Sequence, residues 1–382
     1  MDLRNYTDAK NRRTALEQAL KITLPAIGSF SLSEDFASHH NCENMVGAVQ
    51  IPLGIAGPLD FSDDKKHTVY IPLATTEGAL VASVNRGIKA VTLSGGASVT
   101  SHRAGISRAP VFVVTNGKAA NVFIDWIETN QKLLNQIAQE TSTHLKLISI
   151  KTWHSGRNVF VRCSYDTQDA MGMNMATIAT EKMVSFITKE TGVVCASVSG
   201  NMCGDKKANM LNVIEGRGIQ TWADVELSPE IIKDVLKTTV PQFVETAHRK
   251  LDIGSRMSGT IGANAHAANV LAAIFLATGQ DMAHVGEAST VMTEVEQGKN
   301  GVYVSVYIPD LPVGTVGGGT ALETQQECLK IMGITGATEG ENVKFFAHCI
   351  AGVVLAGEIS LLAALSAGHL SSAHQKLARG TS

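Results

Sequence analysis

The sequence lacks the short motifs that mark the commonest nucleotide- and metal-dependent enzymes. GxGxxG, GxxxxGK[ST], HExxH and GxSxG do not occur, which excludes a standard Rossmann turn, a P-loop, a zincin helix and a hydrolase nucleophile elbow. The six cysteines form no CxxC pair and have no regular spacing, which argues against a zinc ribbon or a disulfide framework. We therefore expect reduced, buried thiols and no bound metal.

Other absences limit the partners and the location of the protein. Lys and Arg number 32 against 35 Asp and Glu, a net charge of −3, and this balance disfavours a nucleic-acid surface. The N-terminus has no apolar core of the kind that a secretory signal needs. The nearest candidate for a membrane span, Ile350 to Leu365, is broken by Glu358. We expect a cytoplasmic protein with no membrane or nucleic-acid partner.

The chain has ample material for a core, because 44% of its 382 residues are hydrophobic. That length predicts two or three domains, or one large domain with an insertion, for which residues 110–197 are the best candidate. Ser228, followed by Pro229, predicts a helix start. Apolar periodicity predicts strands over 67–73 and 158–163, and helices over 14–22, 80–91, 124–137, 174–187, 269–277, 322–332, 343–354 and 358–370.

Four polar segments each have an ordinary structural explanation when taken alone. Thr75-Thr76-Glu77-Gly78 is typical of a helix N-terminus, and residues 199–207 (SGNMCGDKK) of a surface turn with solvated charges. Gly279-Gln280-Asp281 fits a helix end with a capping Asp. His369 and His374 fit the polar face of a helix, and a spacing of five is poor for a shared metal.

Together, these segments occur in the order and spacing of one enzyme family. DAMGMNM at 169–175, NAHAAN at 264–269 and GTVGGGT at 314–320 complete the set. From about Glu43 to Arg379 the sequence closely resembles the catalytic portion of 3-hydroxy-3-methylglutaryl-CoA (HMG-CoA) reductase, and its motifs are more similar to the biosynthetic, class I type. The resemblance implies reduction of HMG-CoA to mevalonate and CoA with two NADPH.

The resemblance also assigns four catalytic residues. Lys206 matches the lysine that stabilises the oxyanions formed by hydride addition. Glu77 matches a proton donor that burial and hydrogen bonding would keep protonated. Asp281 matches the aspartate that lies between these two groups and tunes their proton affinities. His374 matches the histidine that protonates the departing CoA thiolate.

Three sets of binding residues follow in the same way. The residues that match contacts to the substrate's carboxylate and hydroxyl are Arg108, Ser199, Asp205, Lys207, Lys250 and Asn269. Those that match CoA contacts are Ser83, Asn85, Arg86, Lys237 and His266. Those that match contacts to the dinucleotide are Ser142, Asp169, Met171, Gly172, Met173, Asn174, Val316, Gly317 and Arg379. Thr143 stands where the family usually has an arginine for the 2′-phosphate, so NADPH is favoured while NADH stays possible.

The family fold implies an α+β protein with a large, mostly helical domain, β elements and a long central helix. A small ferredoxin-like α+β domain that binds the cofactor is inserted into it. The expected boundaries are an N-terminal helical segment at 1–42, the large catalytic domain at 43–109 and 198–374, the inserted domain at 110–197 and a tail at 375–382. We expect a homodimer or homotetramer with active sites at the dimer interface.

Three alternatives remain open from the sequence. The weakened 2′-phosphate site is compatible with the same enzyme oxidising mevalonate with NAD⁺ in the catabolic direction. A reductase of a different acyl-CoA is a second alternative. A non-catalytic regulator that binds CoA or a nucleotide is a third, although it would leave Glu77, Lys206, Asp281 and His374 without a purpose.

Overall fold

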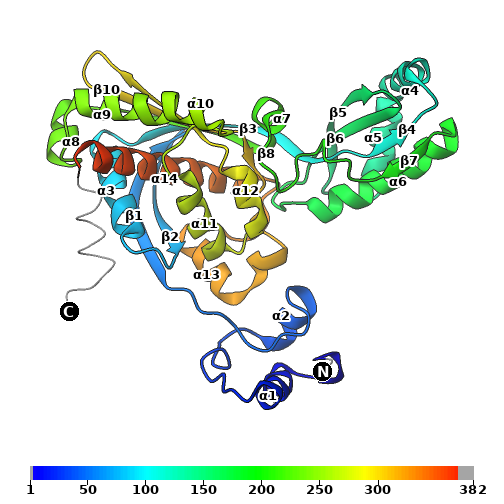
Figure 1. Ribbon diagram of the computed structural model, residues 1–382, viewed down its shortest axis with the longest axis horizontal. Coiled ribbons are helices and arrows are strands. Elements are labelled where there is room, and N and C mark those ends of the chain that lie inside the picture. Colours follow the sequence, from blue (N-terminus) through cyan, green and yellow to red (C-terminus); the bar gives the residue numbers. More distant parts are fainter. Residues whose placement is uncertain (1–2, 369–382) are drawn as a thin grey trace.

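A computed structural model describes residues 3–368 of the chain, which form a mixed helix-and-sheet fold (Figure 1). A helical N-terminal arm projects from a central body, and a smaller lobe extends from that body in another direction (Figure 1). The predicted sites at His374 and Arg379, with His369 and the proposed tail at 375–382, lie outside the described residues.

The arm consists of short helices. Asp8 begins α1 because its side chain accepts a hydrogen bond from the N–H of Asn11, so this helix starts earlier than the predicted residue 14. It ends before Lys21, which has a left-handed backbone. The elements of the arm are η1 (Leu3–Asn5), α1 (Ala9–Leu20) and α2 (Glu34–His40).

A twisted sheet forms one layer of the central body. Its strands β1 and β2 form an antiparallel pair, β1 lies parallel to β3, and β3 continues through β8 and β10 to β9. The strands are β1 (Leu53–Ser62), β2 (Lys66–Ala74), β3 (Ala97–Arg108), β8 (Arg217–Leu227), β9 (Met292–Gln297), β10 (Val302–Ile308) and β11 (Asp310–Leu311). The predicted strand at 67–73 is thereby confirmed.

Helices cover this sheet and enclose the larger hydrophobic core. The helix predicted to begin at Ser228 is confirmed, since the Ser228 side chain accepts from the N–H of Ile231. The helices of the body are α3 (Leu80–Leu93), α7 (Met210–Glu215), α8 (Pro229–Asp234), α9 (Val240–Ala247), η2 (His248–Gly254), α10 (Ser255–Ser258), α11 (Ala267–Thr278), η3 (Met282–His284), α12 (Val285–Ala288), η4 (Gly318–Ala321), α13 (Glu323–Ile331) and α14 (Glu341–Ser366).

The prediction of two C-terminal helices is wrong, because α14 is one continuous helix through Glu358. The Glu358 carboxylate is fully buried and accepts hydrogen bonds from the N–H groups of Ala265 and His266 and from the Thr293 hydroxyl. These partners compensate its burial, so it does not interrupt the helix. By length and composition α14 is apolar enough to cross a membrane, but 83% of its most apolar window is buried in the protein.

The smaller lobe has a second hydrophobic core and an antiparallel sheet of its own. Its strand order is β7-β4-β6-β5, and the end of β3 joins it by pairing with β6. The strand predicted at 158–163 is confirmed as β6. The elements are β4 (Val111–Val113), α4 (Gly117–Thr129), α5 (Gln131–Gln139), β5 (Lys146–Ser155), β6 (Asn158–Asp166), α6 (Met173–Thr191) and β7 (Val194–Ser197).

Two local predictions differ from the structure. The single helix expected over 124–137 is divided into α4 and α5, because the Asn130 side chain donates to the carbonyl of Trp126 and closes α4. The threonines before Glu77 do not cap α3, which begins at Leu80 after the left-handed Ala79. Instead the Thr75 hydroxyl accepts a hydrogen bond from the N–H of Glu77, 3.0 Å away.

Candidate active site

The loop at residues 199–207 connects β7 to α7 and carries the predicted catalytic lysine. Three of its residues have left-handed backbones: Asn201 (φ 65°), Gly204 (φ 68°) and Lys206 (φ 61°). A non-glycine residue pays a steric cost for this conformation, and such residues cluster at functional sites. The Lys206 ammonium lies 2.7 Å from the Asp281 carboxylate. The structure therefore brings together two predicted catalytic groups that are far apart in the sequence.

Asp281 has the capping role that its sequence pattern allows, and it also contacts Lys206. Helix α11 ends at the left-handed Gly279, and the Asp281 side chain then accepts from the N–H of Ala283 to begin η3. Burial raises the pKa of Asp281, but hydrogen bonds from Lys206 and from the Ala283 N–H outweigh it, so the pKa lies below its ordinary value. The carboxylate is therefore ionised beside the Lys206 ammonium.

A buried cluster of charged residues lies behind the loop. The sequence analysis named its Asp205 as a substrate contact but did not find Arg217, Glu287 or Asp310. The Arg217 side chain is fully buried, 2.9 Å from Asp205 and 2.7 Å from Glu287, with Asp310 at 4.0 Å. Arg217, Glu287 and Asp310 lie in β8, α12 and β11. In the sequence, the only feature that could have indicated them is a charged residue within or beside an apolar segment.

Asp205, His284 and Glu287 could also be taken for a metal site, since their ligand atoms lie within 4.8 Å of one another. The Arg217 guanidinium already pairs with two of these three residues. We interpret the group as an ion-pair network in which arginine supplies the positive charge.

Glu77 is paired with Asn269, another predicted site residue, and this pair lies apart from Lys206 and Asp281. Its carboxylate accepts a hydrogen bond of 2.8 Å from the Asn269 amide. The expected burial of Glu77 is not found, because the residue is exposed in the single chain. Asn269 lies in the first turn of α11, whereas Asp281 follows its end. At 1.5 Å per residue, the nine steps from Asn269 to Thr278 separate the Glu77–Asn269 pair from the Lys206–Asp281 pair by about 14 Å along the helix. Within one chain, Asp281 therefore does not lie between Glu77 and Lys206 as predicted.

The other predicted substrate contacts lie mostly around the Lys206 loop. Arg108 at the end of β3 donates to Thr177 at 2.8 Å and lies 3.5 Å from Asp205. Ser199 is exposed at the start of the loop, and the Lys207 ammonium donates to the carbonyl of Asp205. Lys250 lies apart from them, in the π-helical turn η2, a type of element that is frequent at functional sites.

The residues predicted to contact CoA gather where α3 meets α14. Ser83 and Arg86 both contact the hydroxyl of Ser360, at 2.9 and 3.1 Å. The Asn85 side chain accepts from the N–H of Gly57, and the His266 ring lies 2.8 Å from the carbonyl of Gly357. Lys237 is separate from these residues, at an exposed turn before α9.

Two predicted cofactor segments meet although they are more than 140 residues apart. Ala170 forms a parallel bridge with Val316, and the Thr315 N–H donates to the carbonyl of Asp169 at 2.8 Å. Gly317 and Gly318 have positive φ angles, and a Cβ atom at either position would meet no heavy atom within 4 Å. They lie beside a cavity of about 210 Å³ that Val316 helps to line. A glycine backbone beside open space suits close approach of a dinucleotide phosphate.

Other residues of the predicted dinucleotide segment have structural roles in the single chain. The buried Asp169 carboxylate accepts from the N–H groups of Thr338, Gly340 and Val343. Met173 is buried, with its sulfur 2.8 Å from Arg217. The remaining members have the following positions: Gly172 is the left-handed residue before α6, Met171 packs against the small core, Asn174 is exposed on α6, and Ser142 accepts from the N–H of His144.

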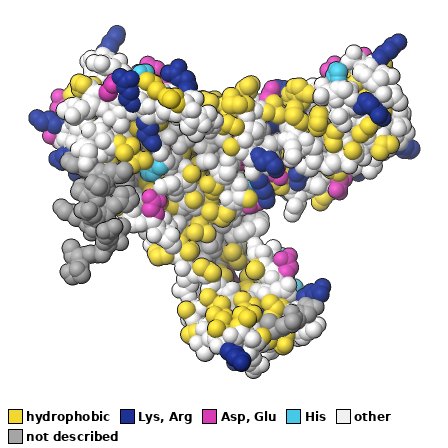
Figure 2. Space-filling model, in the orientation of Figure 1, with side chains coloured by type: hydrophobic (Ala, Val, Ile, Leu, Met, Phe, Trp, Pro, Cys, Tyr) yellow, Lys and Arg dark blue, Asp and Glu magenta, His cyan; other side chains and the backbone are white. Residues whose placement is uncertain are grey.

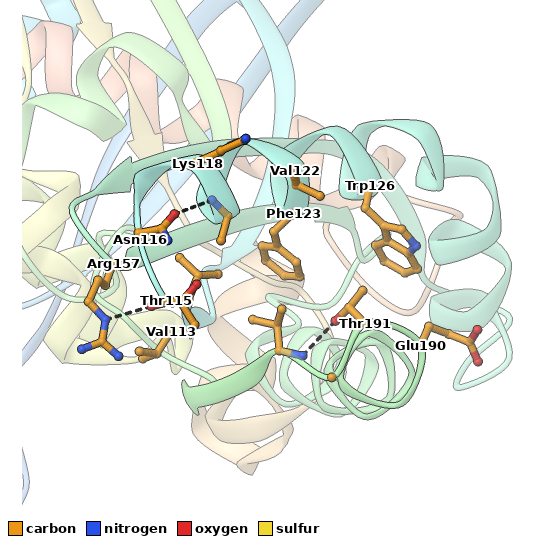
Figure 3. A pocket seen from close by; sticks show the side chains of 14 residues that line it. Val113, Thr115, Asn116, Lys118, Val122, Phe123, Trp126, Arg157, Glu190 and Thr191 are labelled. Atoms are coloured by element: carbon orange, nitrogen blue, oxygen red, sulfur yellow. Dashed lines mark hydrogen bonds between the residues drawn. The ribbon is translucent and has the colours of Figure 1, made fainter.

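A larger cavity of about 700 Å³ lies at the far end of the smaller lobe (Figure 3). Val113, Phe123 and Trp126 form much of its apolar wall, and the polar side chains of Lys118 and Arg157 lie at its rim (Figure 3). None of the predicted site residues lines this cavity. Its volume alone therefore does not identify the active site.

Comparison with known proteins gives one consistent family. The model of the hydroxymethylglutaryl-coenzyme A reductase family matches residues 8–379. A 3-hydroxy-3-methylglutaryl-coenzyme A reductase of Methanothermobacter thermautotrophicus is 46% identical over 371 residues, covering 97% of this chain and 93% of the relative. One from Methanocaldococcus jannaschii is 47% identical over 375 residues, covering 96% and 92%.

The fold comparison agrees at much lower sequence identity. The class II 3-hydroxy-3-methylglutaryl-CoA reductase of Streptococcus pneumoniae, solved with NADPH in open conformations, matches with a TM-score of 0.70. The identity is 15%, and the match covers 95% of this chain and 98% of the other. The architecture is thus shared well beyond the range of close sequence similarity.

We expect Asp205→Asn to destabilise the protein by about 3 kcal/mol at neutral pH, because Arg217 loses one buried partner. Burial raises the pKa of Asp205, but the His284 hydrogen bond and the Arg217 charge outweigh it and hold the pKa well below its ordinary value. A lowered carboxyl pKa stabilises the fold above the unfolded value of 3.8, and this stabilisation is lost as the pH falls below it.

Urea unfolding of wild type and variant between pH 3 and 7 measures this difference. The difference in free energy of unfolding between wild type and variant should have its full size at pH 7 and should become smaller below about pH 4. Asp125→Asn, on the exposed face of α4, is the matched control. A gap that stays constant with pH would contradict the role assigned to the Asp205 charge.

Proposed function

The chain belongs to the hydroxymethylglutaryl-coenzyme A reductase family, and from this premise we propose how its residues reduce HMG-CoA to mevalonate and CoA with two NADPH. The chain is an NADPH-dependent oxidoreductase of mevalonate biosynthesis. The observation that carries the assignment of roles is the Lys206–Asp281 pair, in which the ammonium lies 2.7 Å from the carboxylate and Lys206 has a left-handed backbone.

Lys206 is the electrostatic centre of the proposed mechanism. NADPH supplies a hydride to the thioester carbonyl and, in the second reduction, to the aldehyde. Each addition places a negative charge on the carbonyl oxygen, and the Lys206 ammonium stabilises that charge in the transition state. Asp281 keeps the ammonium in position and is itself ionised. The thioester carbon is reduced by four electrons, and two NADPH are oxidised.

Two further groups move protons in this proposal. Collapse of the hemithioacetal breaks the carbon–sulfur bond and releases a thiolate, to which His374 would give a proton. Glu77 would protonate the alcohol oxygen, and its hydrogen bond to Asn269 fixes the carboxyl group. Arg108, Lys207 and Lys250 would hold the carboxylate of the substrate by charge-assisted hydrogen bonds.

The cofactor assignment rests on the contact between the segments that contain Ala170 and Val316. We propose that the backbone at Val316 and Gly317 meets the phosphates of the cofactor and that Ser142 lies toward the 2′-phosphate, with His144 beside it. The archaeal relatives at 46 and 47% identity favour the biosynthetic class. The lobe of 110–197 has the order β4-α4-α5-β5-β6-α6-β7, which supports a ferredoxin-like domain inserted into the large one.

The geometry favours an active site built by two copies of the chain. Glu77 is exposed and about 14 Å along α11 from the Lys206–Asp281 pair, so one chain leaves the catalytic groups apart. The arm and the neighbouring surface expose apolar side chains (Figure 2), which include Val49, Leu53 and Ile55 at 80, 51 and 41%. We therefore propose a homodimer, or a tetramer of dimers, in which Glu77 of one copy meets Lys206 of another. Cytoplasmic location stays a prediction.

The activity is tested with purified protein, HMG-CoA and either NADPH or NADH. We expect two molecules of NADPH oxidised for each mevalonate and each CoA thiol released, with a higher kcat/KM for NADPH than for NADH. The lost arginine at Thr143 makes this preference modest. Equal or better efficiency with NADH would reject the NADPH assignment. Failure to consume HMG-CoA with either cofactor would reject the function itself.

The shared site is tested by mixing two inactive variants, Glu77→Gln and Lys206→Met. A heterodimer then contains one site with both native groups, so equal mixing with free exchange should restore about a quarter of the wild-type activity. If both groups act within one chain, every site in the mixture lacks one of them. In that case the mixture stays as inactive as its components, and the shared site is disproved.

A further inference from the structure

The backbone of the Lys206 loop is held by a buried carboxylate that belongs to no predicted site. The Glu287 carboxylate, on α12, accepts the backbone N–H of Lys206 at 3.1 Å and a hydrogen bond of 2.7 Å from Arg217. Glu287 is fully buried. Because Lys206 has a left-handed backbone, the acceptor on Glu287 compensates the cost of the conformation that directs the side chain toward Asp281.

A second buried carboxyl group lies beside the first. Asp310, on β11, is fully buried, and the Asn212 amide donates to its Oδ2 at 2.5 Å and reaches Glu287 at 3.5 Å. Burial and the neighbouring Asp310 raise the pKa of Glu287 to about 8, against the lowering effect of Arg217. Burial also raises the pKa of Asp310. Two adjacent buried carboxyl groups near neutral pH hold one proton between them.

Charged groups from several elements face this pair. Arg217 contacts Glu287 and Asp205, and Asp205 also lies 3.5 Å from Arg108. The buried Arg162 donates to Asn212 and lies near Glu215. His284, on η3, faces Asp205, Asp281 and Glu287 at 3.3, 3.9 and 3.6 Å. Loss of the shared proton would add one negative charge to this interior, which is costly.

We propose that Glu287 is a positioning residue for the catalytic lysine and that it acts as one half of a carboxyl pair sharing a single proton with Asp310. This inference rests on the proposed function, since it concerns the placement of the oxyanion-stabilising group. It goes beyond that function because neither carboxyl is among the residues predicted to contact the substrate or the cofactor. According to this proposal, the geometry of the Lys206 loop depends on whether Glu287 and Asp310 together hold one proton.

The test compares amide variants, because each amide imitates one protonated carboxyl group. Glu287→Gln and Asp310→Asn each preserve the net charge of the one-proton state, and Gln still offers an oxygen to the Lys206 N–H. Each single variant should keep kcat/KM within about threefold, whereas the double variant, with one negative charge fewer than the one-proton state, should lose at least about 30-fold. Glu287→Ala removes the acceptor and should lower kcat about 100-fold. Glu190→Gln, exposed on α6, is the control.

The pH dependence supplies a readout that a merely structural role would not change. A raised carboxyl pKa means that the folded state holds the proton more tightly, so stability falls as the pH rises from about 4.5 to about 8. Wild type should show this fall in its melting temperature and an alkaline loss of kcat/KM near pH 8. Glu287→Gln should weaken the fall in melting temperature and move the alkaline loss upward.

The outcomes separate this inference from the proposed function. An active wild type whose double variant loses no more than the two single variants together would overturn the shared proton. So would a Glu287→Gln variant with the wild-type pH profile. An inactive wild type would instead reject the proposed function, and the pH dependence of melting in wild type, the two single amide variants and the double variant would still decide whether the pair shares a proton.

Discussion

The ion pair between Arg217 and the carboxylates around it is the interaction on which the candidate site depends. The arginine is fully buried and contacts Asp205 and Glu287. Asp205 precedes Lys206 in the chain, and Glu287 accepts a hydrogen bond from the Lys206 backbone N–H. A buried guanidinium without partners would cost several kcal/mol, so the loop and the cluster must form together. The fold thus places the exposed Lys206 ammonium by means of a buried arginine and a buried glutamate that are not among the predicted contacts to substrate or cofactor.

The second constraint is the length of α11, which separates Glu77 and Asn269 from Asp281. Helix α14 is buried along nearly its whole length and packs with α3 and α11 in the larger core. This packing holds the Glu77–Asn269 pair and the Lys206–Asp281 pair apart within one chain. A close packing contact enforces this rigidity, since a Cβ atom at Gly87 would lie 1.8 Å from the carbonyl of Ala356. A rigid scaffold with separated halves is what a site shared between copies requires.

The sequence predicted the strands at 67–73 and 158–163 because alternating apolar residues report directly on sheet faces. It also predicted that Lys206 and Asp281 share a site, through the family motifs. It failed at Glu358, because the three hydrogen bonds that make this carboxylate tolerable come from residues 65 to 93 positions away. Arg217, Glu287 and Asp310 were missed for a similar reason: Arg217 and Glu287 are 70 residues apart, Asn212 and Asp310 are 98 residues apart, and these pairings follow no periodicity.

The most direct measurement is the rate of hydride transfer in a single turnover, with HMG-CoA and NADPH saturating, for wild type and Lys206→Met. Methionine retains most of the length of the side chain and removes only the charge that is proposed to meet the oxyanion. The rate should fall by at least about 100-fold while both ligands still bind. Hydride transfer at the wild-type rate in the variant would show that the ammonium at position 206 does not stabilise the transition state.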